Sequence, residues 1–175
     1  MNTFNELAKT RRSIRKFQDR PVEEDKLKNI LKAALMAPSS KRCQPWQFVV
    51  VDEQEKLLQM SVCREMGCKF LDGAPAAIIV LAEESLSDVW VEDASIAAAY
   101  MQLAAEDLGL GSCWIQVRNR MKSDNQTTED YLKEIINAPE GLRIECIIAI
   151  GYKNEEKNPF DETRLKWDKV KKNSF

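Results

Sequence analysis

The feature that most constrains the fold is a stretch from Asp93 to Leu108 that predicts a long helix with almost no polar face. Between Ile96 and Ala105 nearly every position is apolar, and the acids Glu106 and Asp107 follow only at the C-terminal end. A helix that is apolar nearly all round has to be buried. We therefore expect this helix to lie in the core or against a second subunit.

The other apolar patterns predict a sheet with helices on its faces. Residues 76–81 form a continuous apolar run of strand length, which is typical of a strand buried on both faces. We expect further strands at 46–51, 113–117 and 143–150, and helices at 3–9, between Pro21 and Pro38, at 53–62 and at 128–137. This order of elements predicts a sheet with helices on its faces, in an α+β or three-layer arrangement.

The C-terminal segment, residues 152–175, is polar and has no clear period. It is nevertheless too rich in apolar side chains to be plain disorder, namely Phe160, Leu165, Trp167 and Val170. We expect it to pack across a surface. A chain of 175 residues fits one domain with a core of its own, so residues 1–175 are expected to form a single domain with this segment as its tail.

Composition excludes several function classes. A net charge of -2 argues against a nucleic-acid partner. No run approaches the roughly 20 apolar residues that span a bilayer, and the N-terminus lacks a signal-peptide core, so a cytoplasmic protein is expected. The chain has no histidine, which excludes Ser-His-Asp and Cys-His catalysis. Its five cysteines form no CxxC pair, so we expect free thiols and no metal site.

A basic segment near the N-terminus suggests an anionic ligand. Arg11, Arg12 and Arg15 surround the hydroxyl of Ser13. Guanidinium groups suit a phosphate because their planar fork offers paired, charge-assisted hydrogen bonds. A solvated basic helix end explains the same residues equally well.

A second polar feature lies between two prolines. The hydroxyls of Ser39 and Ser40 follow Pro38, and Gln44 precedes Pro45. These hydroxyls and this amide could orient a polar ring edge. Taken alone, however, the segment is more simply explained as a turn.

Both features occur in an ordered set that resembles the flavin-dependent nitroreductase family over essentially the whole chain. The set comprises Arg-Arg-Ser-x-Arg at 11–15, Ala-Pro-Ser-Ser at 37–40 followed by Gln-Pro-Trp at 44–46, Gly-Leu-Gly-Ser-Cys-Trp at 109–114 and Ala-Ile-Gly-Tyr at 149–152. The resemblance implies the α+β nitroreductase fold, which has three α/β/α layers around a central mixed, mainly antiparallel sheet. It also implies FMN as cofactor, NADH or NADPH as hydride donor, and a homodimer whose tail packs across the subunits.

The resemblance also implies roles for individual residues. Arg11, Arg12 and Ser13 are expected at the phosphate and ribityl chain, with Arg15 nearer the ring. The loop residues Pro38, Ser39 and Ser40 are expected to complete the site of the opposite subunit. The N5 edge of the flavin is expected to meet Ile115 and Gln116, and Arg164 is expected to return to the phosphate.

The chain departs from the family pattern at three positions. Arg42 stands where the family often has asparagine, and this longer cation could add charge at the flavin or restrict the substrate pocket. Gln116 replaces the common acid or glycine, which bears on nicotinamide recognition. Glu162 occupies one of the two C-terminal positions that are usually basic.

The resemblance predicts an FMN-dependent oxidoreductase that takes hydride from NADH or NADPH and passes it to small electron-poor acceptors such as nitroaromatics and quinones. The flavin carries this chemistry, so no catalytic side chain is expected. A specialised relative such as a reductive dehalogenase needs a long substrate lid, for which the chain is too short. A non-catalytic flavin-binding sensor or storage protein remains as the alternative, because the same arginines would serve it.

Overall fold

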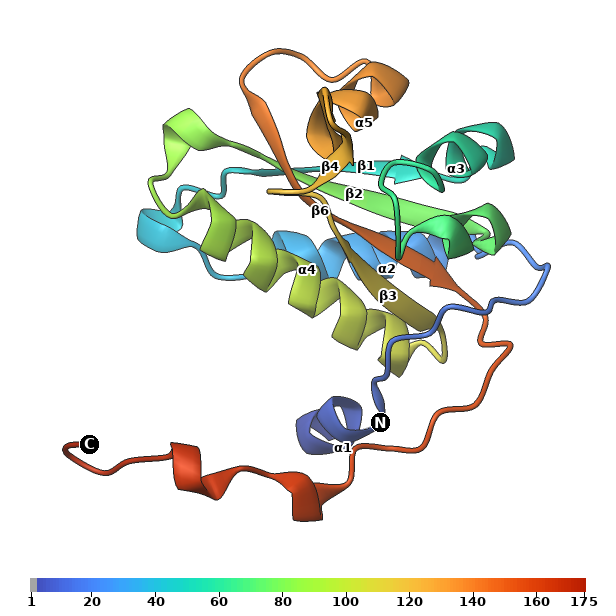
Figure 1. Ribbon diagram of the computed structural model, residues 1–175. Coiled ribbons are helices and arrows are strands. Elements are labelled where there is room, and N and C mark those ends of the chain that lie inside the picture. Colours follow the sequence, from blue (N-terminus) through green and yellow to red (C-terminus); the bar gives the residue numbers. More distant parts are fainter. Residues whose placement is uncertain (1–2) are drawn as a thin grey trace.

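A four-stranded sheet forms the centre of the structure (Figure 1), a computed structural model that describes residues 3–175. The strands are β1 (Trp46–Val51), β2 (Ala76–Glu83), β3 (Gly111–Gln116) and β6 (Leu142–Gly151). Their order is β1-β2-β6-β3, and all three pairings are antiparallel. A parallel contact to this sheet is the isolated bridge between Ser13 and Ser112.

Helices cover both faces of the sheet. Helices α2 (Glu24–Leu35) and α4 (Trp90–Asp107) lie on one face, and α3 (Gln54–Met60) and α5 (Thr128–Ile136) lie on the other (Figure 1). Each face has its own hydrophobic cluster, because alternate side chains of the central strands point to opposite sides. The prediction of an α+β fold with three layers is therefore confirmed.

The remaining elements are short. Helix α1 (Phe4–Thr10) begins with the predicted capping box between Thr3 and Glu6. Strands β4 (Met121–Ser123) and β5 (Gln126–Thr127) form a hairpin that the sequence analysis did not predict. The 3-10 turns are η1 (Ser40–Arg42), η2 (Lys69–Gly73), η3 (Glu84–Leu86), η4 (Glu162–Arg164) and η5 (Trp167–Lys169).

Helix α4 buries one side and exposes the other. It begins at Trp90, three residues before the predicted start at Asp93, whose side chain bonds the backbone of Ser40 rather than capping the helix. The buried side packs on the sheet through small and flexible side chains, namely Ala94, Ala97, Ala98, Met101 and Ala105. On the opposite side Ile96 is 37% exposed and Tyr100 is 41% exposed. Within one chain the helix is therefore only half covered.

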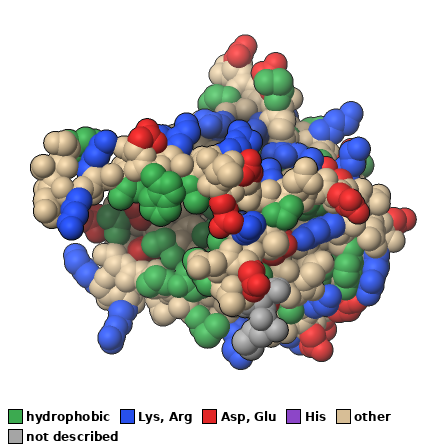
Figure 2. Space-filling model, turned by 90° about the horizontal axis from the view of Figure 1, so that it is seen from below, with side chains coloured by type: hydrophobic (Ala, Val, Ile, Leu, Met, Phe, Trp, Pro, Cys, Tyr) green, Lys and Arg blue, Asp and Glu red, His purple; other side chains and the backbone are tan. Residues whose placement is uncertain are grey.

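The C-terminal tail runs beside the N-terminal segment and then leaves the body of the molecule beneath α1 (Figure 1). Its first part is tied by the backbone bonds Gln18 N to Tyr152 O, Asn154 N to Lys16 O and Phe160 N to Lys9 O. Farther on, Trp167 is 72% exposed. Figure 2 views the molecule from this side and shows hydrophobic side chains gathered around a hollow. Within the part of the chain that the structure describes, no helix is long and apolar enough to cross a membrane.

Glu129 fastens α5 to the sheet. Its carboxylate is nearly buried and accepts hydrogen bonds from Arg143 Nε at 2.9 Å and from the backbone N–H of Ile144 at 3.1 Å. Lys133 lies 3.1 Å from the same oxygen. Burial opposes the ionisation of Glu129, but the hydrogen bonds from Arg143 and Lys133 outweigh it and lower its pKa below the usual value.

We predict that Glu129→Gln lowers the free energy of unfolding at pH 7 by about 2–4 kcal/mol, because two cations and a buried N–H lose their anionic partner. A lowered native-state pKa contributes stability above the ordinary value of 4.5, and this contribution is lost as the pH falls below it. The difference in the free energy of unfolding between the wild type and Glu129→Gln should therefore be smaller at pH 4 than at pH 7, as measured by urea unfolding. The exposed Glu134→Gln on the same helix is the control, and equal stability of Glu129→Gln and wild type at pH 7 would contradict the prediction.

Candidate functional site

The candidate site lies along the free edge of β3, the last strand of the sheet. Ser112 C=O accepts a hydrogen bond from Ile14 N at 3.0 Å, and Gln116 C=O accepts one from Arg64 Nη1 at 3.0 Å. Alternate residues of an antiparallel strand direct their backbone groups to the same side, so the peptide groups of Trp114 also point away from β6. The edge from Ser112 to Gln116 covers four residue-to-residue steps, about 13 Å. It offers backbone hydrogen-bonding groups to a planar ligand.

One end of this edge is closed by the basic segment, residues 11–16. Ile14 is buried, and a Cβ built on Gly111 would lie 2.8 Å from Ile14 Cβ. Only glycine at position 111 therefore permits the approach that brings Ile14 N to Ser112 O. This contact fixes the basic segment beside the strand.

Three polar residues of the segment act electrostatically on Cys113 of β3. Burial raises the pKa of the Cys113 thiol, while the charges of Arg15 and Arg11 and the hydroxyl of Ser13 act in the opposite direction. The guanidinium of Arg15 also lies 5.9 Å from the centre of the Phe70 ring. No salt bridge among residues 3–175 includes an arginine of this segment. The site thus holds cations without a carboxylate partner.

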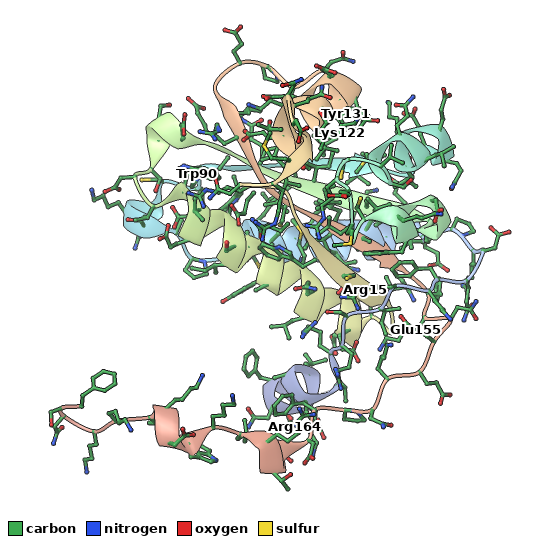
Figure 3. All side chains as sticks on the ribbon, viewed as in Figure 1. Arg15, Trp90, Lys122, Tyr131, Glu155 and Arg164 are labelled. Atoms are coloured by element: carbon green, nitrogen blue, oxygen red, sulfur yellow. The ribbon has the colours of Figure 1, made fainter. Side chains whose placement is uncertain are left out.

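Glu155 holds the backbone of the basic segment rather than its side chains (Figure 3). Its Oε1 accepts hydrogen bonds from the backbone N–H groups of Arg15 at 2.6 Å and Lys16 at 3.2 Å. The bond from Arg15 N, with the contribution of Lys157, lowers the pKa of Glu155. The ionised carboxylate therefore shapes the segment and leaves the Arg15 guanidinium unpaired.

Arg12 points toward the tail instead of toward Cys113. Its guanidinium donates to the carbonyl of Asn158. Arg12 and Arg164 line a common groove of about 880 Å³ between the basic segment and the tail. Figure 3 shows Arg164 beneath α1, apart from Arg15. The four predicted phosphate and ring residues Arg11, Arg12, Ser13 and Arg15 thus divide between two sides of one segment, with Arg164 on the side of Arg12.

The loop Pro38–Arg42 lies at the other end of α4. Ser40 N donates to Asp93 Oδ1 at 2.8 Å, and Asp93 is buried in the first turn of that helix. The 18 residues of α4 span about 27 Å, and the basic segment meets the strand that follows its C-terminal end. One chain therefore does not bring Pro38, Ser39, Ser40 and Arg42 to Arg11 and Arg15.

The backbone of this loop is strained. Lys41, Arg42 and Gln44 have positive φ angles of 51°, 58° and 46°. Each such residue costs about 1–3 kcal/mol and persists where the surroundings hold it, often at functional sites. Here the Ser39 hydroxyl accepts from Gln44 N at 3.0 Å. Asp93 was not predicted as a site residue, although an acid at the start of an apolar helix is a detectable signal.

Gln116 contributes to the edge through its backbone, whereas the backbone groups of Ile115 face β6. Ile115 is buried in the core. The Gln116 amide accepts from Trp114 Nε1 at 2.9 Å and donates to Glu145 Oε1 at 3.2 Å, so it is already engaged. Arg64 and Phe70 were also missed by the sequence analysis, because only the tertiary fold brings them to β3 and Arg15.

Comparison with known proteins agrees with this geometry. The model of the nitroreductase family matches residues 8–66 and 55–152. An Archaeoglobus fulgidus protein provisionally named NADH dehydrogenase/NAD(P)H nitroreductase is 38% identical over 92% of each chain. A Thermotoga neapolitana protein named iodotyrosine deiodinase is 28% identical over 94% of this chain and 96% of its own.

The same fold is found in solved structures. An FMN-dependent nitroreductase from Clostridium difficile R20291 superimposes with a TM-score of 0.95 and is 53% identical, over 97% of this chain and 98% of that one. A Bacteroides thetaiotaomicron protein superimposes with a TM-score of 0.91 at 30% identity, over 100% and 99% of the two chains. The chain therefore belongs to the nitroreductase family.

Proposed function

We propose that this chain is an FMN-dependent oxidoreductase that takes hydride from NADH or NADPH and passes it to nitroaromatic, quinone or similar electron-poor acceptors. The observation that carries the proposal is the pairing of unpartnered guanidiniums with an open strand edge. FMN has one anionic end and one planar ring with polar edge atoms. The basic segment and β3 supply the matching groups side by side.

The residues fit FMN in a defined orientation. Arg11 and Ser13 would hold the phosphate and ribityl chain, and Arg15 would lie nearer the ring. The backbone of Trp114 and Gln116 would bond the polar edge of the ring, with Ile115 between them holding the strand to β6. Arg12 and Arg164, which share a groove, would approach the phosphate from the tail. When bound, the flavin supplies the hydride-transfer chemistry, so the protein needs only to bind and orient it.

The names of the relatives favour the hypothesis of an enzyme over that of a flavin sensor or storage protein. The Archaeoglobus protein is named for NADH or NAD(P)H chemistry and the Clostridium protein for FMN-dependent nitroreduction. Nitroaromatics and quinones are proposed as acceptors because they are typical of the family. The deiodinase named among the relatives belongs to the dehalogenase class, so that acceptor class is part of the same test.

We propose further that the active form is a homodimer built on α4. Ile96 and Tyr100 form an uncovered apolar stripe on this helix, and apolar side chains of the tail are also exposed. A two-fold axis across α4 would pair the helices antiparallel. The strained loop of one subunit, with Ser39 and Ser40, would then lie at the basic segment of the other. The tail, residues 152–175, would pack across the partner.

We expect the purified protein to be yellow and to release FMN rather than FAD, because the site has one phosphate cluster and no glycine-rich dinucleotide fingerprint. Mass spectrometry of the released cofactor decides this. Anaerobic NADH or NADPH should bleach the flavin, and a nitroaromatic, a quinone or an iodinated phenol should restore its colour. Bound FMN that neither nicotinamide bleaches would favour the sensor or storage protein, and a protein that refuses FMN would overturn both.

Arg11 and Arg15 should differ in their effects. We predict that Arg11→Ala weakens FMN binding about tenfold to a hundredfold, the loss of about 1.5–3 kcal/mol from one charge-assisted phosphate contact. Arg15→Ala should instead lower the reduction potential of the bound flavin, because a cation near the ring favours the added negative charge. Titration of apoprotein with FMN and spectroelectrochemistry measure the two effects. If Arg11→Ala binds FMN with wild-type affinity and the flavin bound to Arg15→Ala has the wild-type reduction potential, then the basic segment is only a solvated surface.

The dimer can be tested with one charge. Tyr100→Asp places a carboxylate on the apolar stripe of α4, and we expect it to give a monomer that no longer retains FMN. Light scattering and the flavin content after gel filtration report the two properties. Leu58→Asp is the control, since Leu58 is also an exposed apolar residue but lies on α3, on the opposite face of the sheet. A Tyr100→Asp monomer with wild-type FMN affinity would contradict the shared site.

A further inference from the structure

A second groove opens beside the free edge of β3. It lies between the segment 61–69 and the β4–β5 hairpin, and its volume is about 540 Å³. We call it the hairpin groove; its lining residues are Ser61, Val62, Arg64, Glu65, Lys69, Lys122, Ser123 and Asp124. Neither the family resemblance nor the flavin site described above uses the hairpin side of this groove.

The hairpin groove carries three cations that lack a carboxylate partner. Arg64 donates to the backbone carbonyls of Met66 and Gln116. Across residues 3–175, no salt bridge includes Arg64, Lys69 or Lys122, although two acids line the same groove. Their positive charge is therefore available to an anionic ligand.

Lys122 is held in position before any ligand binds. Its ammonium lies 4.4 Å from the centre of the Tyr131 ring. Tyr131 belongs to α5, and its hydroxyl donates to the carbonyl of Gln59 on α3 at 3.1 Å. Figure 3 shows Lys122 and Tyr131 side by side above the sheet. A cation held on an anchored ring loses less conformational freedom when it binds an anion.

The two acidic side chains of the hairpin groove suit the hydroxyl groups of a ligand whose anionic groups bind the cations. Glu65 and Asp124 are both exposed at the groove, where carboxylates accept hydrogen bonds from ribose hydroxyls. Cations for phosphates, together with carboxylates for ribose, favour a nucleotide over inorganic phosphate. The position agrees, because Arg64 both lines the groove and bonds the Gln116 carbonyl on the edge where the flavin ring is proposed to lie.

We propose that the hairpin groove binds the ribose and diphosphate portion of the nicotinamide dinucleotide. The inference rests on the proposed function and deepens it by assigning residues to the donor. Lys122 binds a phosphate, and the dinucleotide then extends from the groove toward the free edge of β3. The groove thus contributes affinity for the donor and takes no part in holding FMN.

The test compares donors with and without phosphates. Lys122→Gln removes one charge from the groove, and Lys32→Gln removes one from the exposed surface of α2, across the sheet. Stopped-flow bleaching of the FMN-loaded proteins is measured against the concentration of NADH, of NADPH and of 1-benzyl-1,4-dihydronicotinamide, which carries neither phosphate nor ribose. Calorimetry measures ADP-ribose binding to the same FMN-loaded proteins as a readout independent of turnover.

We expect Lys122→Gln to raise the apparent Kd for NADH, NADPH and ADP-ribose about fivefold to tenfold. Its apparent Kd for the benzyl donor and its affinity for FMN should equal those of the wild type. Lys32→Gln should match the wild type in all of these measurements. Higher salt should weaken the binding of the dinucleotides to the wild-type protein more than their binding to Lys122→Gln. Equal effects on the benzyl donor and NADH, or no effect on NADH and ADP-ribose, would overturn the groove assignment while leaving the proposed function intact. Wild-type flavin that no donor bleaches would overturn the proposed function and this inference together.

Discussion

The close approach of Ile14 to Gly111 is the contact on which the candidate site depends. Because Gly111 has no Cβ, Ile14 can bury its side chain and donate its N–H to Ser112. The chain then turns away at Arg15, where Glu155 accepts the next two backbone N–H groups. The basic segment consequently covers only the beginning of the β3 edge. This one contact places the arginines of the basic segment beside β3 and leaves the rest of the free edge of β3 uncovered.

The layered core follows from the sequence, while its irregular parts do not. The bounds of β1, Trp46–Val51, coincide with the predicted strand because β-branched and aromatic residues fill it between a proline and an acid. The β4–β5 hairpin has strands of three and two residues, too short to show any alternation. Helix α4 starts three residues before the predicted start at Asp93, whose side chain makes a tertiary contact with Ser40 that the sequence does not reveal.

The candidate site is predictable only as far as its local motif. Arg11, Ser13 and Arg15 lie at alternate positions of one short segment, and in the structure all three act on the Cys113 thiol of β3. That Arg12 turns to the tail depends on Asn158, which is 146 residues away. Arg64 reaches Gln116 across 52 residues. Contacts between residues so far apart in the sequence produce no periodic pattern, so they cannot be predicted from the sequence.

Helix α4 connects the unexplained features of the single chain. Its length of about 27 Å separates the strained loop from the basic segment, although both resemble parts of one flavin site. An antiparallel pair of such helices removes the separation, since the start of one lies beside the end of the other. The same pairing, proposed above for the homodimer, would cover Ile96 and Tyr100, which are exposed in one chain, and would bring a partner to the strained residues Lys41, Arg42 and Gln44. In the proposed homodimer, the exposure of the helix and the strain of the loop would have one origin, because each is a cost to the single chain that contact with a second subunit would offset.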